Sequence, residues 1–198
     1  FEINAKGTLN ILECLNKLCP TSSIFYSSTN KVYGNLNDLS YTETPLRYIL
    51  QDFPRGMPET TPLSFASPYG CSKGAADQYV LDYGKRTKLK TVVFRHSSIF
   101  GERQFASFDQ GWLGWFITKA IQQKQSNEEF TISGDGKQVR DVLFVDDIID
   151  CYFMALNQID KIQSEAFNIG GGYENSLSLL ELFDILKNKI NKKLEYSK

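Results

Sequence analysis

Tyr69 and Lys73 lie four residues apart and are the pair in this chain best suited to chemistry. On a helix with 3.6 residues per turn, both side chains would stand on one face. An ammonium beside a phenol favours the phenolate, because it lowers the pKa of a tyrosine from its ordinary value of about 10. Such a phenol can remove the proton of a sugar hydroxyl while a hydride leaves the carbon beneath it. A pair with this spacing arises about once by chance in a chain of this composition, so its surroundings must decide.

A run of small hydroxyl residues from Ser27 to Thr29 precedes Tyr69 by 40 residues and ends a short apolar segment. Ligands of open parallel sheets bind beyond the carboxyl ends of the strands. We therefore expect Thr29 to hydrogen-bond the hydroxyl that Tyr69 deprotonates. The alternative is a Ser/Thr-rich turn that closes a strand and has no chemical role.

Strand and helix patterns alternate along the chain, and these elements must position the pair. Helices are expected over residues 4–18, 68–86, 112–123 and 146–157, and a last one from a capping box of Ser178 and Glu181. Strands are expected over residues 23–28, 91–95, 131–133 and 166–170, and residues 35–67 read as a long irregular segment. Apolar strands that alternate with helices predict the α/β class, with a doubly wound parallel sheet covered on both faces.

Composition narrows the partners. The chain has 198 residues and a net charge of −1, with 22 basic and 23 acidic residues spread along it, so we expect no nucleic-acid partner. No apolar run approaches the ~20 residues of a membrane helix, so no membrane partner is expected. The four cysteines form no Cys-x-x-Cys pair and the chain opens without a signal peptide, which favours a reduced, cytoplasmic protein without a metal site.

Four motifs carry a resemblance that covers essentially the whole chain. They are Asn4-Ala5-Lys6-Gly7-Thr8-Leu9-Asn10-Ile11-Leu12-Glu13, Ser27-Ser28-Thr29-x-x-Val32-Tyr33-Gly34, Tyr69-x-x-x-Lys73 and Gln138-Val139-Arg140-Asp141-Val142. In order and spacing they resemble the extended short-chain dehydrogenase/reductases, the NAD-dependent nucleotide-sugar epimerases and dehydratases. The resemblance implies a Rossmann-like sheet with a small α/β substrate-binding lobe, NAD as cofactor and a nucleotide-sugar substrate. It also implies a homo-oligomer, with the helix that carries Tyr69 as the candidate surface.

The resemblance also implies roles for single residues. Thr29 would be the catalytic Ser/Thr and Tyr69 the acid/base, while Lys73 tunes the tyrosine and holds the nicotinamide ribose. Cofactor contacts are expected at Asn4, Ser27, Ser28, Tyr69, Lys73, Arg95 and His96. Substrate contacts are expected at Ser98, Arg103, Gln104, Phe105 and Arg140.

Three of these roles have details or alternatives. Arg140 would grip the diphosphate, or else be a surface arginine paired with Asp141. Phe105 would stack on a pyrimidine ring. His96, the only histidine, is expected to pack beside the nicotinamide rather than to act as an acid or base.

One family feature is absent from this sequence: the glycine-rich turn that cradles the dinucleotide pyrophosphate. Because the chain also opens at Phe1, we expect an N-terminally truncated domain that by itself holds NAD weakly, and an inactive isolated chain is one of the alternatives. Residues 1–198 would be one domain fragment. Its residues 1–100 would be the later part of the dinucleotide-binding core, and residues 101–198 mostly the substrate-binding lobe with returning core elements.

Two positions separate the reactions of the family. Dehydratases carry Asp-Glu where this chain has Asn30 and Lys31, and neither can do a carboxylic acid's proton transfers. The chain resembles the CDP-tyvelose epimerases in residues 96–105 and 109–116, together with residues 28–33 and 69–79. This resemblance implies inversion of carbon two of a CDP-deoxyhexose through a transient ketone. The alternatives are a dehydratase or reductase of the same family, or an inert fragment or binding module.

Overall fold

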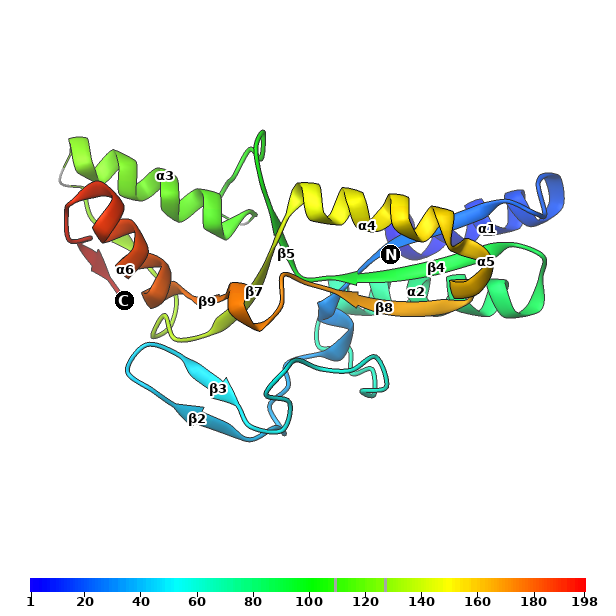
Figure 1. Cartoon of the computed structure of the whole chain (residues 1–198), viewed down its shortest axis with the longest axis horizontal. Coiled ribbons are helices and arrows are strands. Elements are labelled where there is room, and N and C mark those ends of the chain that lie inside the picture. The colour runs from blue at the N-terminus through cyan, green and yellow to red at the C-terminus, as the bar shows by residue number, and fades with distance from the viewer. Residues whose placement is uncertain (109, 127) are drawn as a thin grey trace. The chain divides into compact units, whose positions relative to one another are not determined.

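The computed structural model of the chain describes residues 1–108, 110–126 and 128–198 (Figure 1). Asp109, the first residue of the expected segment 109–116, lies outside the described residues. The described part forms two compact units. The first comprises residues 1–38, 57–97 and 146–170, and the second residues 39–56, 98–145 and 171–198.

The first unit is built on a parallel three-stranded sheet. Its strands are β1 (Ser23–Thr29), β4 (Lys90–His96) and β8 (Glu165–Ile169), in the order β1-β4-β8. Ser28 lies opposite Arg95, and Arg95 opposite Asn168, so the carboxyl ends of the three strands coincide. The predicted parallel sheet is confirmed.

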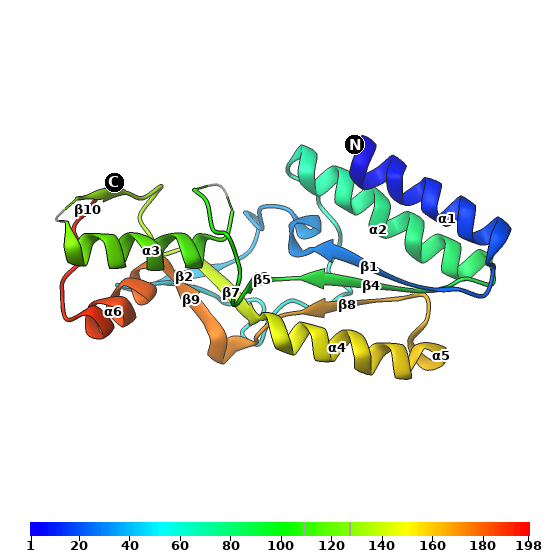
Figure 2. The same ribbon diagram turned by 90° about the horizontal axis from the view of Figure 1, so that it is seen from above.

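Helices cover both faces of this sheet, as Figure 2 shows. On one face lie α1 (Gly7–Leu18), preceded by the π-helical turn η1 (Glu2–Lys6), and α2 (Pro68–Arg86). On the other lie α4 (Val145–Asn157) and α5 (Ile159–Ile162).

Alternation along β4 explains the two apolar layers. Val93 packs with Leu12 and Val80 of the α1 and α2 layer, whereas Val92 and Phe94 pack on the opposite side with Ala155 and Ile159. The predicted α/β class with a sheet covered on both faces is therefore confirmed.

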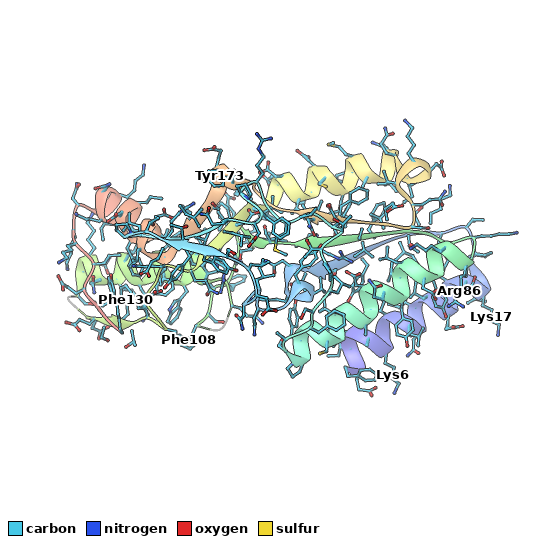
Figure 3. All side chains as sticks on the ribbon, turned by 90° about the horizontal axis from the view of Figure 1, so that it is seen from below. Lys6, Lys17, Arg86, Phe108, Phe130 and Tyr173 are labelled. Atoms are coloured by element: carbon cyan, nitrogen blue, oxygen red, sulfur yellow. The ribbon has the colours of Figure 1, made fainter. Side chains whose placement is uncertain are left out.

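The outer side of η1, α1 and α2 carries exposed charged side chains as well as exposed apolar ones such as Ile11 and Leu18. Lys6, Lys17 and Arg86 project away from the sheet (Figure 3). No helix in the described part of the chain is long and apolar enough to cross a lipid bilayer.

The second unit contains a mixed sheet and two helices. Its strands β5 (Ser98–Phe100), β7 (Val139–Phe144) and β9 (Ser176–Ser178) lie in the order β5-β7-β9, the first pair parallel and the second antiparallel. The other elements are α3 (Trp112–Gln125), α6 (Leu179–Ile190), the short turn η3 (Tyr173–Asn175) and the two-residue strands β6 (Phe130–Thr131) and β10 (Tyr196–Ser197). Phe130 (labelled in Figure 3) packs on Phe183, with ring centroids 5.6 Å apart, in an apolar core that also contains Leu113.

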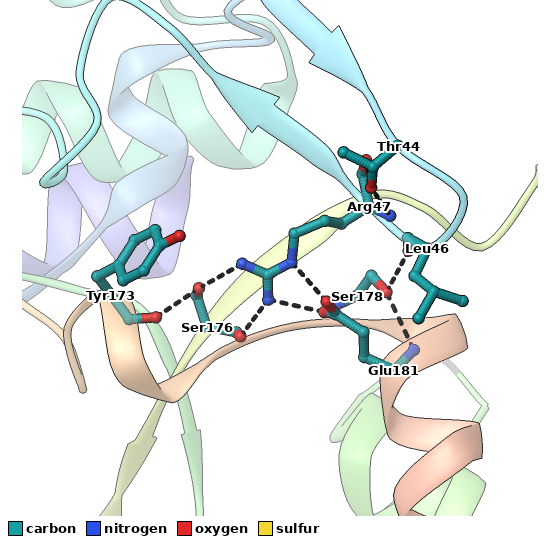
Figure 4. Close-up of polar contacts among 7 residues, drawn as sticks. All are labelled: Thr44, Leu46, Arg47, Tyr173, Ser176, Ser178 and Glu181. Atoms are coloured by element: carbon teal, nitrogen blue, oxygen red, sulfur yellow. Dashed lines mark hydrogen bonds and ion pairs between the residues drawn. The ribbon is translucent and has the colours of Figure 1, made fainter.

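The segment 35–67 is more ordered than the sequence indicates. It contains an antiparallel hairpin of β2 (Tyr41–Glu43) and β3 (Tyr48–Leu50), so the prediction of an irregular segment is wrong there. Arg47, directly before the returning strand, explains the order, because its Nε and Nη2 donate to the carboxylate of Glu181 at 2.6 and 2.7 Å (Figure 4).

The same glutamate caps helix α6. The Glu181 amide donates to Ser178 Oγ at 3.1 Å, and the Ser178 amide donates back to Glu181 Oε2 at 2.8 Å. The predicted capping box is confirmed. The hairpin is thus bound to a helix start that is already fixed.

Candidate active site

Helix α2 presents Tyr69 and Lys73 in its first two turns. Ser67 caps it by accepting a hydrogen bond from the Gly70 amide at 3.0 Å, and Pro68 occupies the first turn. Gly74 lets the helix approach its neighbour closely, because a Cβ there would lie 2.2 Å from the Phe65 ring. The sequence therefore fixes where this helix begins and how closely it packs.

The ammonium of Lys73 lies at the carboxyl end of β1. Its Nζ donates to the carbonyl oxygen of Ser27 and lies 4.4 Å from the centroid of the Tyr26 ring. Burial lowers the pKa of Lys73, and the carboxylate of Asp77 opposes that change. The structure thus brings the predicted lysine and the predicted strand end together.

Tyr26 is a member of the site that sequence reasoning missed. Burial raises the pKa of Tyr26 to about 12, and the charges of Asp77 and Tyr69 act in the same direction. At neutral pH Tyr26 therefore keeps its proton despite the nearby Lys73. Tyr69, by contrast, is 51% exposed and accessible to a substrate. The two-residue period of β1, which places Tyr26 on the same face as Ser28, is the signal that could have found it.

Thr29 ends β1 and starts the short helix η2 (Asn30–Tyr33). It is buried, and its Oγ1 accepts a hydrogen bond from the Lys31 amide at 3.2 Å. A hydroxyl in this position is a helix cap, and its own proton is held only weakly, with Asn30 Oδ1 3.5 Å away. Its contact with a substrate hydroxyl stays a prediction.

His96 ends β4 directly opposite Thr29. Its Nδ1 lies 3.1 Å from Ser27 Oγ and its Nε2 3.4 Å from the Tyr152 hydroxyl. Burial first, and the charge of Lys73 second, lower the pKa of His96 to about 4. The imidazole is therefore neutral at pH 7 and contributes no charge beside Lys73.

Asn4 reaches the same helix from the other side. Its Nδ2 donates to Ser72 Oγ at 3.1 Å, and Ser72 Oγ donates to the Tyr69 carbonyl at 3.0 Å. Asn4 lies in the π-helical turn η1, a backbone form that is rare and often found at functional sites. It is thereby held beside the turn between Tyr69 and Lys73.

Ser28 and Arg95, two predicted cofactor contacts, lie in a buried polar network. Arg95 donates from Nε and Nη2 to the two oxygens of Asp77 at 2.9 and 3.0 Å, and Ser28 Oγ donates to the same carboxylate at 2.7 Å. A direct contact of either residue with a cofactor stays a prediction. Sequence reasoning missed Asp77, although its position four residues after Lys73 places it on the same face of α2.

The predicted substrate residues all lie in the second unit. Ser98 begins β5, opposite Val142 of β7, two residues from Arg140. Arg103 has a positive φ of 64°, Gln104 Nε2 donates to the Ile99 carbonyl at 3.2 Å, and Phe105 is 96% exposed. Strands β5 and β7 thus bring Ser98 and Arg140 onto neighbouring strands, while the other three lie on the segment after β5.

Arg140 is half-buried and its side chain has no partner among the residues that the structure describes. Burial lowers the pKa of Arg140. Asp141 instead accepts a hydrogen bond from the Gly171 amide at 2.7 Å, and burial raises the pKa of Asp141. The alternative of a surface pair between Arg140 and Asp141 is therefore wrong, because that carboxylate is turned to the backbone of the glycine turn.

Known proteins share this arrangement of elements. Residues 1–170 match the NAD dependent epimerase/dehydratase family. The chain belongs to that family. A CDP-paratose 2-epimerase of Salmonella typhi is 58% identical over 192 residues, which are 96% of this chain and 57% of the relative. A putative UDP-glucose 4-epimerase of Methanocaldococcus jannaschii is 35% identical over 96% of this chain and 53% of its own length.

Solved structures agree with the family. A dTDP-glucose 4,6-dehydratase of Bacillus anthracis in complex with NAD has a TM-score of 0.75 and 28% identity, over 98% of this chain and 54% of that protein. A UDP-glucose 4-epimerase of Thermotoga maritima with UDP-glucose has the same TM-score and identity, over 99% and 56%. The chain spans a little more than half the length of the curated relatives described here.

Proposed function

We propose that this protein is an NAD-dependent nucleotide-sugar epimerase that inverts carbon two of a CDP-deoxyhexose. The observation that carries the proposal is the position of Lys73, whose ammonium is fixed at the carboxyl end of β1 one helical turn from the half-exposed Tyr69. The 58% identity to a CDP-paratose 2-epimerase supports the choice of sugar and nucleotide.

The donor groups around Lys73 fit the ribose of a nicotinamide cofactor. Within the described residues the ammonium makes one hydrogen bond, to Ser27 O, so two of its three N–H groups are left for hydroxyls. Lys73 would hold the ribose, and Asn4, Ser27 and His96 would lie beside it. Ser28 and Arg95 would lie further from the ribose, near the ends of their strands. When bound, NAD supplies an acceptor that takes a hydride from the carbinol carbon and gives it back.

The chain's own residues move the proton. Tyr69 acts as a phenolate, which the charge of Lys73 stabilises, and becomes a phenol when it takes the proton of the substrate hydroxyl. Tyr26 does not compete for that role, because burial keeps its phenol protonated. Thr29 orients the hydroxyl. The resulting ketone is flat, so reduction on its other face inverts the carbon, and Tyr69 returns the proton.

The second unit would bind the nucleotide. Arg140 is a partly desolvated guanidinium without a counter-charge in the described residues, which suits the diphosphate of a nucleotide-sugar. Phe105 would stack on the cytosine, with Arg103, Gln104 and Ser98 supplying polar contacts.

We extend the proposal to the organisation of the protein. The first unit would be the later part of the dinucleotide-binding core, and the second the substrate-binding lobe. A homo-oligomer and a cytoplasmic location are part of the same proposal. The four cysteines, all free thiols, support only the location.

Product analysis tests the function. The intact protein with a CDP-deoxyhexose should yield the epimer at carbon two, with no net consumption of NADH and no loss of water. Tyr69→Phe should lower turnover by about 10²- to 10⁴-fold and leave nucleotide-sugar binding intact, because only proton transfer is removed. Release of water would instead indicate a dehydratase, and NADH consumption a reductase. Unchanged turnover of the variant would refute the role of Tyr69.

A further inference from the structure

A polar row crosses the sheet of the first unit where its strands end. Ser28, Arg95 and Asn168 are register partners on β1, β4 and β8, so their side chains share one face. On that face Asp77 of α2 accepts from Arg95 and Ser28, and Tyr33 of η2 lies between Arg95 and Asn168. The Tyr33 hydroxyl accepts from Arg95 Nη1 at 2.9 Å and donates to Asn168 Oδ1 at 2.7 Å.

The ion pair at the centre of this row is almost completely removed from water. Asp77 is 0% and Arg95 5% exposed. Taking two charges out of water offsets most of their attraction, so a well-packed apolar pair would be at least as stable. Stability alone therefore does not account for an ion pair at this place. The fixed geometry of the ion pair accounts for it, because the forked guanidinium binds a carboxylate only in a narrow range of positions.

Each arm of the network ends next to a residue of the proposed site. Ser28 directly precedes Thr29, and Tyr33 ends the helix η2 that Thr29 caps. Asp77 follows Lys73 by one helical turn on α2. The chain around Thr29 is thus held from both sides by groups that are fixed to one guanidinium.

The last arm of the network reaches residues 57–59, where the chain re-enters the first unit. Asn168 Nδ2 donates to the Met57 carbonyl at 2.8 Å, and the Asn168 amide donates to a carboxylate oxygen of Glu59 at 2.8 Å. The start of the segment that leads to Tyr69 is thereby fixed to the same row of residues.

We infer that the Asp77–Arg95 pair is a positioning device: through Ser28 and Tyr33 it fixes the Thr29 hydroxyl relative to Tyr69 and Lys73. This inference rests on the proposed function. Ser28, Tyr33, Asp77 and Arg95 are positioning residues in it and need not touch the substrate.

The test removes one arm at a time and leaves the ion pair in place. Ser28→Ala deletes the hydroxyl that donates to Asp77, and Tyr33→Phe deletes the one that joins Arg95 to Asn168. Each should lower kcat by about tenfold to 100-fold with little change in KM, because a displacement of about 1 Å in a reacting group has such an effect. Tyr83→Phe is the matched control, since Tyr83 is a buried tyrosine whose hydroxyl donates to Glu13 on α1.

A double variant separates positioning from general loosening of the fold. If Tyr33 acts through Thr29, adding Tyr33→Phe to Thr29→Ala should lower kcat by less than about twofold further. A full additional loss in that background, or single variants as active as Tyr83→Phe, would overturn the inference while the epimerase stands. An intact wild-type protein without epimerase activity would instead refute the proposed function, and the positioning role with it.

Discussion

His96 should titrate far below an ordinary imidazole, and as the only histidine it can be followed directly. It is 7% exposed and lies between Ser27 and the Tyr152 hydroxyl. Burial first, and the charge of Lys73 second, lower the pKa of His96 from 6.5 to about 4. Protonation would place a second cation beside Lys73, on a ring that is itself largely closed to water.

The shift makes stability depend on pH in a defined window. Between pH 6.5 and about 4 the unfolded chain binds a proton at His96 that the folded protein does not, so stability falls as the pH is lowered through this range. A pKa difference of about 2.5 corresponds to roughly 3 kcal/mol in full, of which about 2.5 kcal/mol is lost by pH 4.5.

Two measurements check this prediction. The ring-proton resonance of the single histidine should titrate with a midpoint near pH 4 in NMR spectra. Urea unfolding at pH 7.5 and 4.5 should show that the wild type loses about 2.5 kcal/mol more than His96→Gln, because carboxylates contribute equally to both. A midpoint above pH 6, or equal losses in the two proteins, would refute the reasoning.

Two further predictions concern the second unit. Arg140→Leu should weaken nucleotide-sugar binding about tenfold or more without lowering the melting temperature, because it removes a desolvated charge that has no partner in the described residues. Calorimetry measures both the binding and the melting temperature. A large fall in stability would contradict this prediction. Arg47→Ala should destabilise the β2–β3 hairpin by about 1–3 kcal/mol, since Glu181 loses its partner. Proteolysis within residues 39–56 should then be faster in Arg47→Ala than in the control variant Arg55→Ala. Unchanged cleavage of Arg47→Ala would refute the stabilising role of the Arg47–Glu181 pair.

Local patterns predicted the elements that carry the site. The bounds expected for the helix over residues 68–86 are those of α2, because proline near its start and a regular buried face are local features. The strands before Thr29 and through Arg95 also lie where apolar runs placed them. The spacing of Tyr69 and Lys73 could therefore be interpreted before any contact was known.

Contacts between distant residues could not be predicted in this way. The hairpin in segment 35–67 depends on Arg47 and Glu181, which are 134 residues apart. The buried pair of Asp77 and Arg95 forms because α2 packs on β4, and no local pattern shows that these two residues meet. Propensity describes a residue and its near neighbours, whereas these features are fixed by tertiary packing.

The most direct test of the account is the fate of hydrogen at the inverted carbon. A CDP-deoxyhexose with deuterium on carbon two, incubated with the intact protein and NAD in ordinary water, should give an epimer that keeps the label on that carbon. Retention is predicted because Tyr69 handles only the hydroxyl proton, while the carbon-bound hydrogen leaves and returns without meeting solvent. Loss of the label to water would contradict the account.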